Sequence, residues 1–292
     1  MILYMNGQWI EHHQAVVSAY DHGFLYGIGL FETFRTYNGR PFLLDEHLSR
    51  LEKDCGELGI RYQPDRSGIM QIIRELLARN GLDDAYIRLS VSAGIGEIGL
   101  PSADYDSPSV IFYAKSLPPR PNWEASARPL QRLKLRRNSP EAGWRMKSFH
   151  YMNNILAKRE LLQYPWLAGV HAEGLFLNSS GHLAEGMVSN LFFVSAGECF
   201  TPSLDTGILS GITRQFVIRL CESRSIPVHS GHYSWEMLLE ADEVFITNSI
   251  QEIVPISVLF DEDGQCRRIG AGGPGPIAAK LHEDYQSYCW SK

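Results

Sequence analysis

Lys147 lies in GWRMKSFHYMNNILA, residues 143–157, where an irregular stretch leads into a predicted helix. A lysine at such a junction is usually a solvated surface charge. A lysine in an apolar pocket has a lowered pKa instead, and it can act as a base or as a nucleophile toward a carbonyl carbon. The chemistry open to Lys147 therefore depends on what other stretches of the chain bring to it.

The stretch SGITR, residues 210–214, has the features of a helix beginning. Ser210 or Gly211 is placed to cap the helix, and Thr213 puts a hydroxyl group in its first turn. The first backbone amides of a helix have no partner within it, so they bind phosphate together with the helix dipole. This stretch predicts a phosphate site.

Two further stretches matter in combination with these: AEGMVSN, residues 184–190, and TNSIQEIVPI, residues 247–256. Taken alone, Glu185 in the first of them would be an exposed glutamate in a turn. A lysine followed along the chain by AEGMVSN, SGITR and TNSIQEIVPI, in that order, resembles the pattern of the fold-type IV family of pyridoxal-phosphate enzymes. That family includes branched-chain and D-amino-acid aminotransferases and 4-amino-4-deoxychorismate lyases, and the resemblance covers almost the whole chain.

The resemblance implies pyridoxal 5'-phosphate as the cofactor. This cofactor requires an amine for the Schiff base, a partner for its pyridine nitrogen, a phosphate site and a contact to its phenolic oxygen, and residues of this chain would supply all four. Lys147 would form the Schiff base, and Glu185 would face the pyridine nitrogen and keep the ring protonated. Arg50, in DEHLSRL, would form the charged wall of the phosphate site. Tyr151 matches a tyrosine that contacts the phenolic oxygen in the aminotransferases. The other implied cofactor residues are Asn190, Gly211, Ile212, Thr213, Asn248 and Ser249.

Two reactions are open within this family, and catalytic groups alone do not separate them. In both, the amine of Lys147 removes the proton from the amine-bearing carbon of the substrate. An aminotransferase returns that proton to the cofactor. A 4-amino-4-deoxychorismate lyase instead expels the neighbouring enolpyruvyl oxygen, which yields pyruvate and 4-aminobenzoate. The run from Tyr20 to Leu51 closely resembles the lyases of Gram-positive bacteria. We therefore predict a lyase of folate biosynthesis, with a D-amino-acid or branched-chain amino-acid aminotransferase as the alternative.

The substrate of such a lyase is an anionic amino-dicarboxylate, which requires cationic partners. Arg35 and Arg88 are the candidates, although a structural role is equally open for each. Arg35 alternates with Thr33 on a predicted strand, so both would share one face. D-Amino-acid aminotransferases have a tyrosine in place of Phe31, whereas branched-chain aminotransferases share the Y-I-R run that ends at Arg88. The expected substrate residues are Phe31, Thr33, Arg35, Arg88 and Ile250.

Composition limits the other classes of function. The chain has 292 residues, 44% of them hydrophobic and 21% charged, with a net charge of −6. Its charge argues against nucleic-acid binding, and we expect neither a signal peptide nor a membrane span. Five scattered cysteines without a CxxC pair are typical of a reduced, cytoplasmic protein. The resemblance also implies a homodimer.

Two motifs resemble a dinucleotide-binding site and a metal site, but neither has the surrounding residues that such a site requires. GIGEIG, residues 94–99, matches a dinucleotide-binding pattern, but the prolines and turn residues after it prevent a helix from starting there. We predict a loop. His229 and His232 have a spacing that could suit a metal, but no third ligand is evident, so no metal is expected.

The fold predicted is a two-domain α+β and α/β protein of the D-amino-acid aminotransferase type. Residues 1–115 would form a small N-terminal α+β domain with an antiparallel meander, and the proline-rich residues 116–126 an interdomain linker. Residues 127–292 would form the larger cofactor-binding domain, with a barrel-like sheet flanked by helices. Within the first domain we expect strands at 30–37, 41–44, 85–93 and 109–114, and helices that follow Asp45 and cover 65–80.

Overall fold

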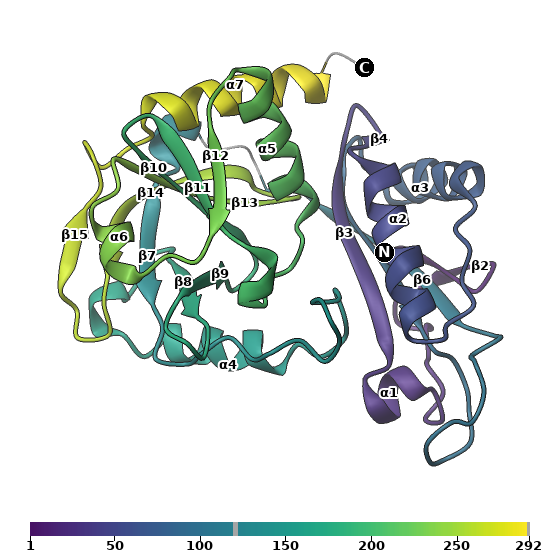
Figure 1. Ribbon diagram of the computed structural model, residues 1–292. Helices are drawn as coiled ribbons and strands as arrows, with labels where there is room; N and C mark the ends of the chain where they lie inside the picture. The colour runs from purple at the N-terminus through teal and green to yellow at the C-terminus, as the bar shows by residue number, and fades with distance from the viewer. Residues whose placement is uncertain (119–121, 291–292) are drawn as a thin grey trace. The chain divides into compact units, whose positions relative to one another are not determined.

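The computed structural model describes residues 1–118 and 122–290, and its contacts divide the chain into two units (Figure 1). The first unit is Met1–Pro118 together with Met146–His150. The second unit comprises the described residues of 119–145 and 151–292. The short segment that carries Lys147 therefore packs with the N-terminal unit. Part of the predicted linker, residues 119–121, lies outside the described residues.

The first unit is built on one antiparallel sheet with the strand order β2-β1-β6-β5-β3-β4. The sheet residues alternate between two faces, as the period of a strand requires. On β5, Ile87, Leu89 and Val91 belong to the apolar core, while Arg88 and Ser90 alternate with them. The strands are β1 (Ile2–Met5), β2 (Gln8–Glu11), β3 (Gly29–Tyr37), β4 (Arg40–Pro41), β5 (Ala85–Ser92) and β6 (Ser109–Ser116).

Two helices, α2 (Leu44–Glu57) and α3 (Arg66–Asn80), supply the other half of this core. Asp65 caps α3, and its side chain accepts a hydrogen bond from the amide of Ser67. The predicted beginning of α2 after Asp45 is wrong, because α2 begins one residue before Asp45 and Leu43 precedes it in a left-handed conformation. Asp45 lies instead in the first helical turn, where a negative charge is favourable. The predicted strand over residues 41–44 is wrong for the same reason, since β4 ends at Pro41.

The sheet of the second unit closes into a ring, because β9 pairs with β10 as well as with β8. Six strands form the ring in the order β10-β13-β14-β7-β8-β9, while β11, β12 and β15 extend it. This confirms the predicted barrel-like sheet. The strands are β7 (Arg128–Arg132), β8 (Glu173–Leu177), β9 (Leu183–Gly186), β10 (Asn190–Ser195), β11 (Glu198–Pro202), β12 (Val228–Gly231), β13 (Glu243–Asn248), β14 (Glu252–Phe260) and β15 (Cys266–Arg268).

Helices flank this ring, and the side chains of β10 are buried on both faces of the sheet. On β10, Leu191 and Phe193 join one buried cluster, while the ring of Phe192 stacks on that of Phe245 at 5.1 Å. Helices α5 and α7 pack on each other and on β13 and β14. The longer helices of the unit are α4 (Met152–Leu161), α5 (Ile212–Ser223) and α7 (Pro276–Trp290), and the short helices of the chain are α1 (His22–Tyr26) and α6 (Trp235–Leu239). Among the described residues, no helix is long and apolar enough to cross a bilayer.

Candidate active site

Lys147 is held beside the beginning of β3 by two backbone hydrogen bonds. The amide of Phe31 donates to the carbonyl of Lys147, and the amide of Phe149 donates to the carbonyl of Gly29, both at 2.9 Å. The side-chain amine of half-buried Lys147 lies 4.6 Å from the centre of the Phe31 ring. A short strand-like pairing therefore positions the lysine, and the helix that follows it in the sequence begins only at Met152.

Glycine is required where this segment meets the sheet. A Cβ atom at Gly29 would come within 2.3 Å of the Phe149 ring, and one at Gly23 within 3.3 Å of the same ring. Both distances are shorter than ordinary packing allows. The ring of Phe149 thus fixes the segment two residues beyond Lys147.

Arg50, the predicted phosphate residue, lies in a buried cluster with Glu32 of β3 and His47 of α2. Its Nε and Nη2 atoms donate to the two carboxylate oxygens of Glu32, each at 2.7 Å. The Nδ1 atom of His47 donates to the same carboxylate at 2.6 Å. Burial raises the pKa of Glu32, but the charges and hydrogen bonds of Arg50 and His47 outweigh it and lower the pKa to about 2. Burial lowers the pKa of His47, and the nearby Glu32 carboxylate opposes that shift.

Arg88 shares the face of the sheet on which Phe31 lies. Its guanidinium carbon is 3.7 Å from the centre of the Phe31 ring, the ring that the amine of Lys147 also approaches. Thr33 lies directly opposite Arg88 across the β3–β5 pair. Arg35 is buried on the same strand, with its guanidinium over the ring of Tyr37 at 4.8 Å.

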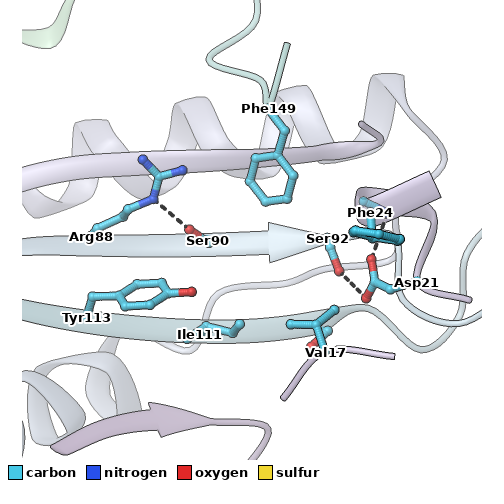
Figure 2. Close-up of a pocket in the computed structure, with 11 residues that line it drawn as sticks. Val17, Asp21, Phe24, Arg88, Ser90, Ser92, Ile111, Tyr113 and Phe149 are labelled. Atoms are coloured by element: carbon cyan, nitrogen blue, oxygen red, sulfur yellow. Dashed lines mark hydrogen bonds between the residues drawn. The ribbon is translucent and has the colours of Figure 1, made fainter. Parts of the chain in front are cut away.

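A pocket of about 310 Å³ opens on this face of the first unit. Figure 2 shows Arg88 and Tyr113 at one end of it and Asp21 and Phe24 at the other. The Nε atom of Arg88 donates to Ser90 at 3.0 Å, which turns the guanidinium along the pocket wall. Of the predicted substrate residues, only Arg88 is among the described residues that line this pocket. The described residues that line the pocket combine apolar side chains with the Arg88 guanidinium at one end and the Asp21 carboxylate at the other.

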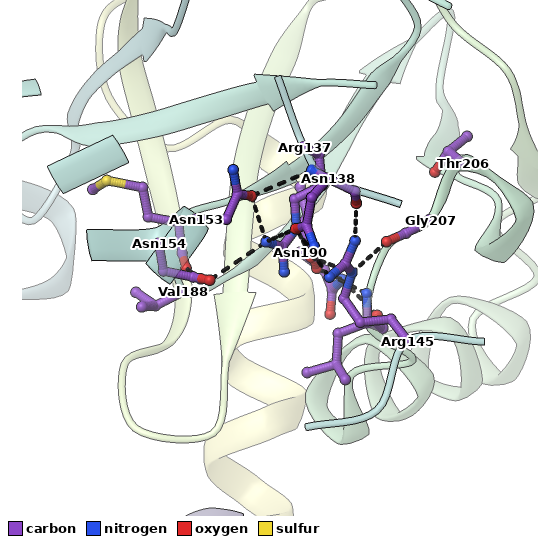
Figure 3. Close-up of polar contacts among 12 residues, drawn as sticks. Arg137, Asn138, Arg145, Asn153, Asn154, Val188, Asn190, Thr206 and Gly207 are labelled. Carbon is purple, nitrogen blue, oxygen red and sulfur yellow. Dashed lines mark hydrogen bonds and ion pairs between the residues drawn. The ribbon is translucent and has the colours of Figure 1, made fainter. Parts of the chain in front are cut away.

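In the second unit, Glu185 near the end of β9 is buried. Figure 3 shows Arg137, Arg145 and Asn190, three of the polar side chains around it. Its Oε1 atom accepts a hydrogen bond from the Nε atom of Arg137 at 2.8 Å. Its Oε2 atom accepts from the backbone amide of Leu209 at 2.9 Å and from Asn190 at 3.5 Å. Glu185 is therefore not the exposed turn residue that its local sequence alone would indicate.

Sequence reasoning missed Arg137 and Arg145, which are both buried beside Glu185. The Nε atom of Arg145 lies 3.7 Å from the carboxylate and donates to the carbonyl of Gly207. Burial and the nearby charge of Arg137 lower the pKa of Arg145 to about 10. No local signal could have found Arg137, because the adjacent Arg136 is exposed in the same irregular stretch.

The turn that follows Glu185 is braced by Glu173 of β8. The carboxylate of Glu173 accepts hydrogen bonds from the amide of Val188 at 3.1 Å and from the hydroxyl of Ser189 at 3.2 Å. A Cβ atom at Gly186 would lie 2.7 Å from Glu173 Oε1 and 2.2 Å from Ser189 Oγ. Glycine at 186 thus lets the turn close tightly behind Glu185.

The beginning of α5 has the features of a phosphate site. Gly211 is its N-cap residue, and no side chain of a described residue caps it by a hydrogen bond. The hydroxyl groups of Thr213 and Ser249 lie 3.2 Å apart beside this helix end. Amides without a side-chain cap, two hydroxyls and the helix dipole together fit a phosphate group.

Two asparagines shape this region. A Cβ atom at Gly211 would lie 1.9 Å from Oδ1 of Asn190, so the helix end and the asparagine fit only with glycine there. Asn190 also donates to the carbonyl of Leu209 at 2.9 Å. The Oδ1 atom of Asn248 accepts from the amides of Ile250 and Gln251 at 3.0 and 2.8 Å, so its side chain shapes the turn around Ser249.

The predicted residues thus fall into two groups, one in each unit. Tyr151 is the N-cap residue of α4, and Ile212 is the first residue of α5. The first unit contains Phe31, Thr33, Arg35, Arg50, Arg88 and Lys147, and the second contains Tyr151, Glu185, Asn190, Gly211, Ile212, Thr213, Asn248, Ser249 and Ile250.

The alternative motifs remain outside these groups. Residues 94–99 lie in a connection between β5 and β6 without a helix, which confirms the predicted loop. His229 and His232 pair with Glu198 and Asp205 at 2.9 and 3.0 Å. No group of three potential metal ligands occurs among the described residues.

The family model for amino-transferase class IV matches residues 29–259. The chain belongs to this family, and its cofactor is pyridoxal 5'-phosphate.

Individual proteins agree with this assignment. The chain is 44% identical over 262 residues to the aminodeoxychorismate lyase of Bacillus subtilis, covering 88% of this chain and 86% of the relative. It is 36% identical over 289 residues to a Methanocaldococcus jannaschii protein provisionally named a branched-chain-amino-acid aminotransferase, covering 98% and 96%. A solved branched-chain aminotransferase of T.th. with pyridoxamine 5'-phosphate superposes with a TM-score of 0.86 at 29% identity, covering 99% of this chain and 94% of that one.

Proposed function

We propose that the protein is an aminodeoxychorismate lyase, which converts 4-amino-4-deoxychorismate to 4-aminobenzoate and pyruvate in folate biosynthesis. The observation that carries this proposal is that the Lys147 amine and the Arg88 guanidinium both lie close to the ring of Phe31. The Lys147 amine and the Arg88 guanidinium lie 4.6 and 3.7 Å from the centre of the Phe31 ring. A carboxylate bound by Arg88 would therefore hold its ring close to the amine that moves the proton. The similarity to the Bacillus subtilis lyase supports the same assignment.

Lys147 acts as the base in this proposal. When bound, pyridoxal phosphate supplies an electron sink next to the amine-bearing carbon of the substrate. The amine of Lys147 removes the proton from that carbon, and the electron pair forms a ring double bond. The bond between the neighbouring carbon and the enolpyruvyl oxygen breaks, and the enolpyruvate that leaves gains a proton to become pyruvate. The remaining ring is aromatic 4-aminobenzoate.

The other residues position or neutralise charge. Arg88 binds a substrate carboxylate, with Arg35 and Thr33 as further polar groups of its sheet face and Phe31 as an apolar surface for the substrate ring. The beginning of α5 binds the cofactor phosphate, and Glu185 faces the pyridine nitrogen. The remaining proposed contacts to cofactor or substrate are Arg50, Tyr151, Asn190, Gly211, Ile212, Thr213, Asn248, Ser249 and Ile250.

An amino-acid aminotransferase is the second candidate function. It is favoured by the 36% identity to the Methanocaldococcus jannaschii relative and by the superposition on branched-chain aminotransferases. In that reaction Lys147 returns the proton to the cofactor, and no carbon–oxygen bond breaks. The two reactions therefore differ in their products.

A product assay separates the two functions. The holoenzyme is incubated with enzymatically generated 4-amino-4-deoxychorismate, and in parallel with D-alanine or L-leucine plus 2-oxoglutarate. The lyase predicts equimolar 4-aminobenzoate and pyruvate with little glutamate. Glutamate without 4-aminobenzoate would move the function to the aminotransferases. After loading with pyridoxal phosphate, the wild-type protein should show a visible absorption band that Lys147→Ala lacks. A wild-type protein that shows no such band would contradict both candidate functions.

We further propose that the enzyme is a homodimer that works in the cytoplasm. Several apolar side chains of α4 and the residue after it are exposed, which is typical of a covered surface. These are Met152, Ile155, Leu156 and Leu162. Cys55, Cys199, Cys221 and Cys266 are free thiols, which suits a reducing compartment. Light scattering after gel filtration tests the dimer, and a monomeric mass at micromolar concentration would contradict it.

A further inference from the structure

Arg137 connects Glu185 to the beginning of α4. Its Nε atom donates to Glu185 at 2.8 Å, and its Nη1 atom donates to the Oδ1 atoms of Asn153 at 2.7 Å and Asn154 at 3.4 Å. Asn153 and Asn154 are the second and third residues of α4, which begins directly after Tyr151. One guanidinium group thus joins the end of β9 to a helix distant in sequence (Figure 3).

The contacts of Glu185 assign a separate task to Arg137. Among the described residues, Oε1 of Glu185 accepts a hydrogen bond from Arg137, whereas Oε2 has the amide of Leu209 and Asn190. Removing Arg137 would leave one oxygen without its close donor and let the carboxylate turn about its other contacts. The planar fork of an arginine can hold such a carboxylate and a second acceptor together, which a lysine ammonium cannot do in the same geometry.

The surroundings of Arg137 hold it rigidly. The guanidinium lies 5.2 Å from the centre of the Phe176 ring, and its side chain is buried. The side chain of Asn154 in turn donates to the carbonyl of Met187, in the turn just after Glu185. Arg137 therefore joins the beginning of α4 to the Glu185 carboxylate, and Asn154 joins it to the turn just after Glu185.

We propose that Arg137 is a positioning residue that sets the orientation of Glu185 toward the cofactor's pyridine nitrogen. This inference rests on the proposed cofactor role of Glu185 and not on the lyase reaction. A carboxylate in a fixed plane offers a lone pair to the ring nitrogen without reorganisation, which is how preorganised charges act in enzymes. Arg137 itself acts through Glu185.

The chain offers a matched control in Arg132 of β7. Like Arg137, Arg132 forms an ion pair with a carboxylate, that of Glu262, and lies over an aromatic ring, that of Trp235 at 4.9 Å. These two partners belong to neither the surroundings of Glu185 nor α4. A purely structural role for both arginines would make Arg137→Met and Arg132→Met behave alike.

The test uses full-length apoprotein titrated with pyridoxal phosphate. For Arg137→Met we expect a Kd about tenfold higher and a weakened circular dichroism of the bound cofactor, because an ionic hydrogen bond that holds its partner is lost. Arg137→Lys should fall between this variant and the wild type. Arg132→Met should have a lower Tm, with an unchanged Kd and cofactor spectrum.

A wild-type Kd and a wild-type cofactor spectrum in Arg137→Met would overturn the inference. If that variant does not fold, Arg137→Lys decides by the same two readouts. Neither readout depends on product formation. A wild-type protein that binds the cofactor but makes no 4-aminobenzoate would therefore remove the lyase proposal and leave the role of Arg137 to be judged by its own result.

Discussion

Each unit buries one carboxylate against an arginine, and the two pairs are built differently. Glu32 of the first unit accepts hydrogen bonds from one helix, because His47 and Arg50 both lie on α2. Glu185 of the second unit accepts hydrogen bonds from residues 137, 190 and 209, which lie on separate segments. The first arrangement ties one helix to one strand, while the second requires most of the unit to be folded.

The two carboxylates also differ in how fully their oxygens are hydrogen-bonded. Both oxygens of Glu32 accept close hydrogen bonds from charged or ring donors, and its pKa falls to about 2. Glu185 holds one close arginine, one amide and one long contact at 3.5 Å. We therefore expect Glu32 to matter most for folding and Glu185 most for the reaction.

The largest expected effect is that of Glu185→Gln on turnover. If Glu185 faces the pyridine nitrogen as proposed, an amide there would lack the charge that keeps this nitrogen protonated, so kcat should fall on the order of a thousandfold. Glu32→Gln, assayed at a temperature at which it is folded, should lose about tenfold or less. Equal losses in 4-aminobenzoate formation for the two variants would break the comparison.

The second effect concerns stability. Glu32→Gln leaves the largely buried Arg50 charge without this counter-ion, so the free energy of unfolding should fall by about 3 kcal/mol in a urea titration. Glu75→Gln is the matched control, because Glu75 pairs with Arg79 on the exposed surface of α3 at 2.6 Å. That change should cost less than about 1 kcal/mol. A loss for Glu32→Gln no larger than that of the control would contradict the stabilising role.

The third effect follows from the lowered pKa of Glu32. A carboxylate with a folded-state pKa of about 2 and an ordinary value of 4.5 binds protons more readily in the unfolded chain. Its contribution is complete above about pH 4.5 and is lost as the pH falls toward 2, on the order of 3 kcal/mol in total. The wild type should lose stability in this range more steeply than Glu32→Gln. Parallel curves from pH 5 to pH 3 would contradict the assignment.

The smallest effect is that of Gly211→Ala. The added Cβ atom would meet Oδ1 of Asn190 at 1.9 Å, and Asn190 would have to move away from Glu185 and from the helix end. The Kd for pyridoxal phosphate should rise about tenfold, the cost of one disturbed phosphate or carboxylate contact. Gly56→Ala is the control, since a Cβ there meets nothing within 4 Å. An unchanged Kd in Gly211→Ala would show that the glycine is not needed for the phosphate site.

Local sequence patterns predicted the structural features that depend on residues close together in the sequence. The helix over residues 65–80 and the helix that begins after Gly211 each depend on neighbouring residues, and the structure contains both. The predicted beginning of α2 was wrong because Leu43 adopts a left-handed conformation that its residue type does not favour.

Such patterns could not predict contacts between residues that are far apart in the sequence. The pairing of β7 with β14 and the contact between Arg137 and Glu185 join residues far apart in sequence, and nothing in either stretch specifies the partner. The resemblance supplied Lys147, Glu185 and Arg50 because family motifs carry them. Glu32 and His47 needed the structure, since the alternation of β3 gives no reason for a glutamate among its apolar core residues.

The most direct test of the account is the rate of 4-aminobenzoate release by Lys147→Ala with excess pyridoxal phosphate. If Lys147 moves the proton, the rate should fall at least about a thousandfold, and added methylamine should restore part of it. Lys158→Ala, on α4, should keep the wild-type rate. Wild-type 4-aminobenzoate formation by Lys147→Ala would contradict the account, because the proton would then be removed by another group.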